Sequence, residues 1–188
     1  MKSVLIVIRT QWVNKIISGK KTIEVRKTAP KEVPFKAYIY ETKHATEMPW
    51  VDEDGHFIYK GRGQVIGEFI CDRIDEYKYV YCDHPEIGYP VGYDCGDNWY
   101  DIDDEDLQKA CLTEEEFKRY GNGKPLYGWH ISDLKIYDEP RKLSEFRKPC
   151  KINLPMCDRC EYYSTWSGRC ENITRAPQSW QYIGEVEQ

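Results

Sequence analysis

Residues 18–27 read Ser-Gly-Lys-Lys-Thr-Ile-Glu-Val-Arg-Lys and combine a helix stop with a short charged strand. Successive side chains of a strand point to opposite faces, so Glu24 and Arg26 share one face, while Ile23 and Val25 share the other. The apolar pair is suited to a core, and the charged row is suited to a polar ligand. The candidate ligand-binding residues of this stretch are Lys20, Lys21, Glu24 and Arg26.

The residues before this stretch predict a strand followed by a helix. Residues 4–8 are all apolar, which is typical of a buried strand. Thr10 is suited to cap a helix, and apolar side chains recur at helical spacing from Trp12 to Ile17. Gly19 is suited to the left-handed conformation that ends a helix. The predicted order is strand, short helix, glycine turn and charged strand.

The composition is that of a folded protein with one core and a small appendage. Of 188 residues, 40% are hydrophobic, and there are 15 tyrosines and six tryptophans. No apolar run approaches the roughly 20 residues that a membrane span needs, so we expect no membrane partner and a cytoplasmic location. Because the cytosol keeps thiols reduced, the eight cysteines call for an explanation other than disulfides.

The net charge of −5 conceals an uneven distribution of charge along the chain. Residues 1–36 hold nine Lys or Arg against two Glu, whereas residues 94–116 hold ten Asp or Glu against one Lys. The split predicts one basic and one acidic surface. The acidic block fits a solvated insertion, and the alternatives are that it mimics phosphate, that it shields the basic face, or that it binds a protein partner.

The rest of the chain predicts several strands and few helices. A capping box at Thr113 and Glu116 starts a short helix that we expect Gly121 to stop, and a second short helix precedes it. Residues 75–103 look irregular, and Gly67 predicts a bulge or a close backbone approach. The fold class expected is α+β, a small and partly open β-barrel with peripheral helices. The predicted strands are 36–42, 64–74, 126–132 and 134–137.

The motif of Gly19, Lys21, Glu24 and Arg26 resembles the Gly-x-Lys-x-x-Glu-x-Arg signature of the ASCH domain family, whose fold is PUA-like. Residues 64–74 and 127–131 are also similar to that family. The resemblance covers about residues 1–146, with an acidic insertion at about 75–124. Residues 147–188 then form a cysteine-rich C-terminal extension, whose ending resembles the tails of some bacterial and phage members.

The resemblance implies a cleft beside the charged strand that binds RNA or a nucleotide-like molecule. It also implies an alternative, because one branch of small ASCH proteins hydrolyses the acetyl amide of N4-acetylcytidine with a lysine, a threonine and a glutamate. Lys21 matches that lysine, but Glu24 occupies the position of the threonine nucleophile. Glu68 is the candidate for the third residue. The chain is therefore expected to be a binding module, and if it is an enzyme, a nucleoside amidohydrolase with Lys21 and Glu24 as its catalytic pair.

The residue types of the charged strand suit several roles. Arg26 offers a planar fork and Lys21 a mobile point charge for phosphate. Glu24 can accept hydrogen bonds from a base amino group or a ribose hydroxyl, or act as a general base. The same three side chains can instead form an internal row of salt bridges that orders the strand. The sequence alone does not choose between these hypotheses.

Aromatic side chains and a histidine complete the predicted ligand site. Trp50 follows Pro49 in a loop and is the candidate for stacking on a base, whereas Trp12 and Trp129 fit apolar patterns of a core. His130 alternates with Trp129 and is expected to face the cleft.

The C-terminal extension predicts a structural zinc site. Cys157 and Cys160 form a Cys-x2-Cys knuckle, with Cys150 seven residues before it and Cys170 ten residues after it. Four thiolates at such spacing suit tetrahedral zinc and leave no open coordination position. The intervening residues are too polar to fold unaided, so a metal would supply the stability. Four free thiols and an iron–sulfur cluster are the alternatives.

Overall fold

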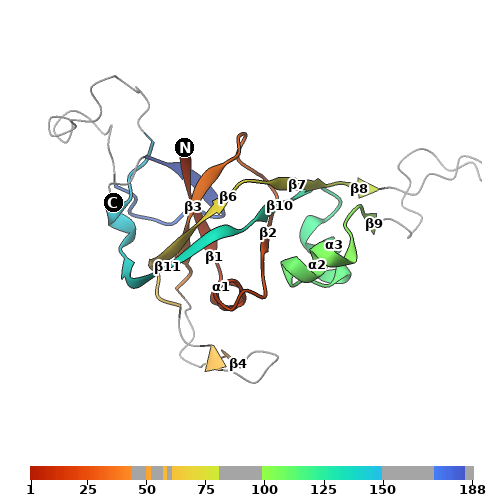
Figure 1. Ribbon diagram of the computed structural model, residues 1–188, viewed down its shortest axis with the longest axis horizontal. Coiled ribbons are helices and arrows are strands. Elements are labelled where there is room, and N and C mark those ends of the chain that lie inside the picture. The colour runs from red at the N-terminus through yellow and green to blue at the C-terminus, as the bar shows by residue number, and fades with distance from the viewer. Residues whose placement is uncertain (44–49, 52–56, 59–60, 81–98, 150–171, 185–188) are drawn as a thin grey trace, which may run out of the picture. The chain divides into compact units, whose positions relative to one another are not determined.

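The computed structural model describes residues 1–43, 50–51, 57–58, 61–80, 99–149 and 172–184 of this chain (Figure 1). It divides the chain into two compact units with interleaved sequences. Unit 1 comprises Met1–Asn14, Pro34–Ile70 and Ser132–Gln188, and unit 2 comprises Lys15–Val33 and Cys71–Ile131. Helix α1 (Thr10–Ile17) begins in unit 1 and ends in unit 2.

Unit 1 contains a five-stranded sheet in the order β11-β6-β3-β1-β12. β1 and β3 are parallel with Val4 opposite Ala37, whereas β12 and β11 are antiparallel to their partners. Its core includes Leu5, Tyr38 and Phe146, and the Tyr38 and Phe146 rings meet edge to face at 5.1 Å. The strands are β1 (Lys2–Ile8), β3 (Phe35–Glu41), β6 (Val65–Cys71), β11 (Ser132–Arg141) and β12 (Trp180–Ile183), with a short pair β4 (Trp50–Val51) and β5 (Phe57–Ile58) and the 3-10 helix η2 (Leu143–Glu145).

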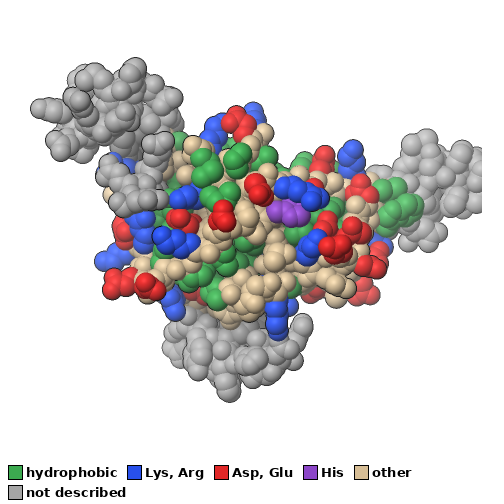
Figure 2. All heavy atoms as spheres, in the orientation of Figure 1, with side chains coloured by type: hydrophobic (Ala, Val, Ile, Leu, Met, Phe, Trp, Pro, Cys, Tyr) green, Lys and Arg blue, Asp and Glu red, His purple; other side chains and the backbone are tan. Residues whose placement is uncertain are grey.

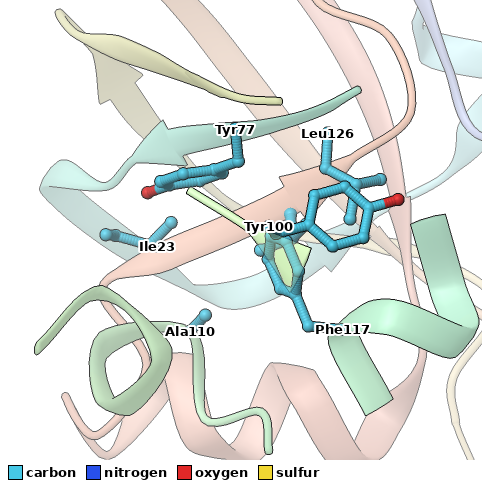
Figure 3. Packing of buried hydrophobic residues seen from close by; sticks show 7 residues of the cluster. Ile23, Tyr77, Tyr100, Ala110, Phe117 and Leu126 are labelled. Atoms are coloured by element: carbon cyan, nitrogen blue, oxygen red, sulfur yellow. The ribbon is translucent and has the colours of Figure 1, made fainter. Parts of the chain in front are cut away.

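Unit 2 contains a three-stranded antiparallel sheet in the order β2-β10-β7. One face of this sheet packs on two helices, and Figure 3 shows Ile23 and Tyr77 of the sheet beside Ala110 and Phe117 of those helices. Its elements are β2 (Ile23–Arg26), β7 (Ile74–Tyr77), β10 (Leu126–His130), the pair β8 (Tyr79–Val80) and β9 (Trp99–Tyr100), and the helices α2 (Asp104–Ala110) and α3 (Glu114–Gly121).

The acidic block has a local structural role in unit 2. Three of its acidic residues form the first turn of α2 and three more form the first turn of α3, where a helix favours negative charge. Asp103 caps α2, and the capping box of Thr113 and Glu116 forms as the sequence predicts. Residues 104–121 therefore contain two helices with apolar residues that enter a core.

Three glycines had predicted structural roles that can be compared with the structure. Gly19 has φ of +73° at the end of α1, as predicted. Gly67 lies where a Cβ would stand 2.5 Å from the Lys135 carbonyl oxygen, which confirms the close backbone approach. Helix α3 ends at Gly121 as expected, but the residue that takes the left-handed conformation is Asn122, at φ of +51°. Gly121 instead leaves room for the Tyr100 ring, whose hydroxyl oxygen would stand 1.8 Å from an added Cβ.

Several expectations about the elements were wrong. The predicted strand 64–74 is two strands, β6 and β7, with a break at residues 72–73, close to the point after Ile70 where the chain passes from unit 1 to unit 2. The region predicted to be irregular contains β7, β8 and β9. Ile17 is 48% exposed and does not belong to the buried stripe of α1. The strand β12 was not predicted at all.

The fold is a mixed α+β structure with three α-helices in the described part of the chain. The strand pairings found there form separate sheets, so the predicted barrel closure stays a prediction. The division into residues 1–146 and 147–188 and the zinc appendage stay predictions as well. No helix that the structure describes combines the length and the apolar character needed to cross a bilayer.

Candidate functional site

The motif begins where α1 ends. The Gly19 amide donates to the Ile16 carbonyl at 3.0 Å, and the Lys21 amide donates to the Lys15 carbonyl at 2.9 Å. The left-handed Gly19 reverses the chain so that these last carbonyls of the helix are satisfied. The chain then enters β2, whose four residues are all buried.

The motif is fastened to the C-terminal end of α2. Lys21 Nζ donates to the Ala110 carbonyl at 2.6 Å, and the Thr22 amide donates to the Lys109 carbonyl at 2.9 Å. The Cys111 thiol lies 3.4 Å from the Lys20 carbonyl oxygen. Carbonyls at a helix end lack partners within the helix and attract a cation. This explains why the Lys21 side chain turns toward α2.

Three charged side chains of the motif meet at Glu24. Arg26 Nη2 lies 2.9 Å from Glu24 Oε1, and Lys21 Nζ lies 3.5 Å from Glu24 Oε2. The three residues are only 3%, 5% and 9% exposed for Lys21, Glu24 and Arg26. The structure therefore brings together three of the four residues that the motif nominated. Lys20, the fourth, is exposed.

Burial changes the chemistry of this cluster. It lowers the pKa of the Lys21 ammonium below its ordinary value, and the charge of Glu24 offsets only part of that effect. Glu24 Oε2 accepts no hydrogen bond from the described residues, and its described neighbour is the ammonium at 3.5 Å. The cluster thus combines a desolvated lysine with a carboxylate oxygen whose hydrogen-bonding capacity is incompletely used.

The strand register separates His130 from the charged row. Residues directly opposite each other in an antiparallel pair share a face, and β10 places Trp129 opposite Glu24 and His130 opposite Ile23. Trp129 is fully buried, as predicted. His130 therefore lies on the face of the sheet opposite to Glu24, and its ligand-binding role stays a prediction.

His130 belongs to a second charged group of unit 2. Its Nε2 lies 2.6 Å from Asp75 Oδ2, and Arg73 contacts both oxygens of Asp75 at 2.8 and 2.9 Å. Burial by itself would raise the pKa of the Asp75 carboxyl, but the bonds from Arg73 and His130 outweigh it and lower that pKa. The side chains of His130 and Asp75 are 20% and 24% exposed, and Figure 2 shows a histidine side chain at the surface among acidic and basic ones.

Glu68 lies in unit 1, on a strand of the five-stranded sheet. Its Oε1 accepts from Lys36 Nζ at 2.9 Å, and its Oε2 accepts from the Tyr137 hydroxyl at 2.6 Å. Burial would raise the pKa of this carboxyl, but the bonds from Tyr137 and Lys36 lower it. The same contact and burial raise the pKa of Tyr137. Both oxygens are therefore already satisfied within unit 1.

The remaining nominated residues cannot be placed. The side chain of Trp50 and all four predicted zinc ligands lie outside the described residues, so the stacking and zinc sites stay predictions. The part of the chain that the structure describes contains no group of three or more potential metal ligands. A protein partner at the acidic insertion, a cytoplasmic location and a phage connection also stay predictions.

Sequence reasoning missed the partners that complete these clusters. The Ala110 carbonyl binds Lys21 from 89 residues away, and Tyr137 binds Glu68 from 69 residues away. No spacing rule links positions so far apart. One signal was available in the sequence. Glu24 and Arg26 are two residues apart on a predicted strand, and this spacing correctly placed them on the same face.

Comparison with solved structures identifies the fold. A single-substitution mutant of the ASCH protein from Zymomonas mobilis matches with a TM-score of 0.51 and 17% identity, over 96% of this chain and 87% of that chain. The chain has an ASCH fold. The unsubstituted Zymomonas mobilis ASCH protein matches with a TM-score of 0.49 and 16% identity, over 99% of each chain.

The ASCH fold confirms, at the level of architecture, the resemblance that the motif indicated. No family model matches the sequence, and no curated protein matches it either. At 17% identity the likeness to the solved ASCH structure concerns the fold alone. The chemistry of the cluster must therefore be argued from this chain's own residues.

Proposed function

We propose that this chain binds RNA or a nucleotide-like molecule at the motif that runs from Gly19 to Arg26. The observation that supports this most is the buried Lys21, whose pKa is lowered and whose ammonium lies 3.5 Å from Glu24. Titratable groups perturbed by both burial and a specific charged partner are concentrated at functional sites.

A gain in stability does not readily explain the buried charges of Lys21, Glu24 and Arg26. Desolvating two charges costs as much as or more than their attraction returns, so buried ion pairs are often neutral or unfavourable compared with apolar residues. The cluster nevertheless occupies a strand whose other two residues, Ile23 and Val25, enter the core of unit 2. A binding role gives a reason for charges at these positions.

The residue types suit a nucleotide. Arg26 supplies a planar fork and Lys21 a point charge for phosphate oxygens. Glu24 Oε2 has capacity for a hydrogen bond from a base amino group or a ribose hydroxyl. An internal salt-bridge row that only orders β2 is the competing explanation, and the two differ in their response to added ligand.

The test is the binding of labelled single-stranded RNA and free nucleotides across a salt series. We expect Lys21→Met and Arg26→Lys each to weaken binding by about tenfold or more. The salt dependence should become shallower by about 0.7 in log–log slope for each phosphate that a variant no longer neutralises. Lys118→Ala is the matched control, because it removes one positive charge from the surface of unit 2, where Lys118 pairs with Glu114.

Circular dichroism and thermal unfolding show whether each variant is folded before its affinity is compared. Folded variants with unchanged affinity, or a wild-type chain without affinity for any RNA or nucleotide, overturn the proposal. The Arg26→Lys variant keeps a positive charge beside Glu24, so we expect it to fold. A loss of affinity in this variant therefore reports the loss of the guanidinium group.

A second candidate function is hydrolysis of an amide on a modified nucleoside such as N4-acetylcytidine. The lowered pKa of Lys21 favours it, because a desolvated lysine is more readily neutral and can accept a proton. Glu24 would then be the catalytic partner, although the branch of ASCH proteins with this activity has threonine there. Release of acetate from N4-acetylcytidine that disappears in Lys21→Met supports this function. No release by the folded wild-type chain removes it.

A further inference from the structure

A row of three side chains crosses the sheet of unit 2 next to the charged cluster. Tyr127 of β10 lies directly opposite Arg26 of β2 on one side and Glu76 of β7 on the other. Directly opposite residues share a face, so Arg26, Tyr127 and Glu76 form one line on the face that also carries Glu24. Figure 1 shows the three strands of this sheet.

Exposure increases along this row. Arg26 is 9% exposed and contacts Glu24 at 2.9 Å, Tyr127 is half-buried, and Glu76 is exposed. The next row inward holds Glu24 and the fully buried Trp129. The row of Arg26, Tyr127 and Glu76 is thus the border between the buried cluster and solvent.

The Tyr127 ring is held beside the Glu76 carboxylate. The Tyr127 hydroxyl donates to Glu76 Oε1 at 3.3 Å, and burial together with Glu76 raises the pKa of Tyr127. Glu76 is exposed, and this bond uses one lone pair of Oε1, so the carboxylate has further acceptor positions in reach of solvent. An aromatic face, a carboxylate and a guanidinium therefore occupy three adjacent strands spaced about 4.8 Å apart.

These three groups match three features of one nucleotide, which are the face of its base, the edge of its base and its phosphate. Aromatic rings bind unstacked bases by stacking, and a carboxylate accepts from N–H groups on the Watson–Crick edge. Guanine is the base that presents two adjacent N–H donors on that edge, at N1 and N2, and so fits both oxygens of one carboxylate. Cytosine and adenine present one amino group there, and uracil presents one ring N–H.

We propose that Arg26, Tyr127 and Glu76 bind a single unstacked guanine nucleotide of RNA. Tyr127 stacks on the base, Glu76 accepts from guanine N1 and N2, and Arg26 faces the phosphate. This assignment rests on the proposed RNA-binding function and adds the base that the site prefers.

The experiment measures the affinity of the full chain for four labelled RNA heptamers that differ at one position, UUUGUUU, UUUAUUU, UUUCUUU and UUUUUUU. We expect the guanine heptamer to bind about tenfold more tightly than the others. A fifth heptamer with inosine in place of guanine lacks the N2 amino group, and we expect it to lose most of that preference.

The variants separate stacking from edge recognition. We expect Glu76→Gln to abolish the guanine preference with little effect on the uridine heptamer, and Tyr127→Ala to weaken all heptamers by about fivefold or more. Tyr127→Phe keeps the ring and is expected to retain the preference. Glu115→Gln is the matched control, because it neutralises an exposed carboxylate of α3 in the same unit.

The outcomes distinguish this inference from the function on which it rests. If no heptamer binds the wild-type chain, the RNA-binding proposal fails and this assignment fails with it. If the heptamers bind in a manner that depends on Lys21 and Arg26 but show no guanine preference, the assignment alone is overturned. A preference that survives Glu76→Gln overturns it as well.

Discussion

Glu24 and Glu68 are two strand carboxylates with a lysine beside each, yet they differ in how completely they are satisfied. Glu68 accepts from Lys36 at 2.9 Å and from Tyr137 at 2.6 Å, one donor for each oxygen. Glu24 has Arg26 at 2.9 Å on one oxygen, while Lys21 lies 3.5 Å from the other oxygen and donates its closer hydrogen bond, at 2.6 Å, to the Ala110 carbonyl.

The difference separates a structural carboxylate from a candidate binding carboxylate. A buried polar group that is fully hydrogen-bonded rigidifies its surroundings and has little left for a ligand. A buried one with unused capacity costs stability and calls for another explanation. The family resemblance nominated both Glu24 and Glu68. Of the two, Glu24 is the carboxylate with an oxygen that accepts no hydrogen bond from the described residues.

The largest expected effect concerns the two cations that face these carboxylates. Replacing Arg26 by Met leaves the buried Glu24 without its closest counter-charge, and we expect the free energy of unfolding to fall by about 3–5 kcal/mol. The Lys36 and Glu68 side chains are 17% and 16% exposed, and Glu68 keeps its hydrogen bond from Tyr137, so we expect replacement of Lys36 by Met to cost less, about 1–2 kcal/mol. Urea unfolding of both variants measures the contrast.

The double variant Glu24→Gln with Arg26→Met is the control for this comparison. The double variant removes the buried Glu24 charge that Arg26→Met leaves unpaired, so we expect it to recover part of the free energy of unfolding lost in Arg26→Met. Equal losses for Arg26→Met and Lys36→Met would mean that the two carboxylates do not differ in the way the distances indicate.

The second prediction uses pH. The pKa of Lys21 is lowered from 10.5 in the folded chain, so between that lowered value and 10.5 the unfolded chain binds a proton that the folded chain does not. The free energy of unfolding of the wild-type chain should therefore rise with pH in this window, by at most about 1.4 kcal/mol per pH unit from this group. Lys21→Met lacks this contribution, so the difference between the two proteins should change steadily across this window.

Glu68 gives a dependence at the acidic end and serves as the internal reference. Its pKa is lowered from 4.5, so its contribution is present above 4.5 and is lost as the pH falls through the folded value. Glu68→Gln should therefore flatten the acid limb of the stability profile, a change that Lys21→Met should not produce. A Lys21→Met profile parallel to wild type up to pH 10.5 would contradict the lowered pKa.

The smallest expected effect comes from the tyrosine that completes the Glu68 cluster. Tyr137→Phe removes the hydroxyl that donates to Glu68 at 2.6 Å, and we expect a loss of about 1 kcal/mol in the free energy of unfolding. RNA binding should be unchanged, since Glu68 is not proposed to contact the ligand. A loss of RNA affinity in a folded Tyr137→Phe variant would return Glu68 to the site.

Local rules predicted much of unit 2 around the motif. Gly19 takes the left-handed conformation, Thr113 and Glu116 form their capping box, and Glu24 and Arg26 share a face. These features depend on neighbours within a few residues, where turn, cap and strand geometry act. The same rules placed Trp129 in the core.

Long-range packing explains what the local rules missed. The predicted strand at residues 64–74 is split near the point where the chain passes from unit 1 to unit 2. The face of His130 depends on its pairing with Ile23 across two strands, and β12 becomes a strand because β1 offers it an edge. None of these facts has a signature in a short window of sequence.

The sequence by itself determined that charges of both signs would stand together on one strand, because alternation along a strand follows from backbone geometry. Only the tertiary structure decided that Lys21 would be desolvated and would turn to the Ala110 carbonyl. Burial and hydrogen-bond partners depend on which distant segments pack against a residue, and that packing distinguishes Glu24 from Glu68.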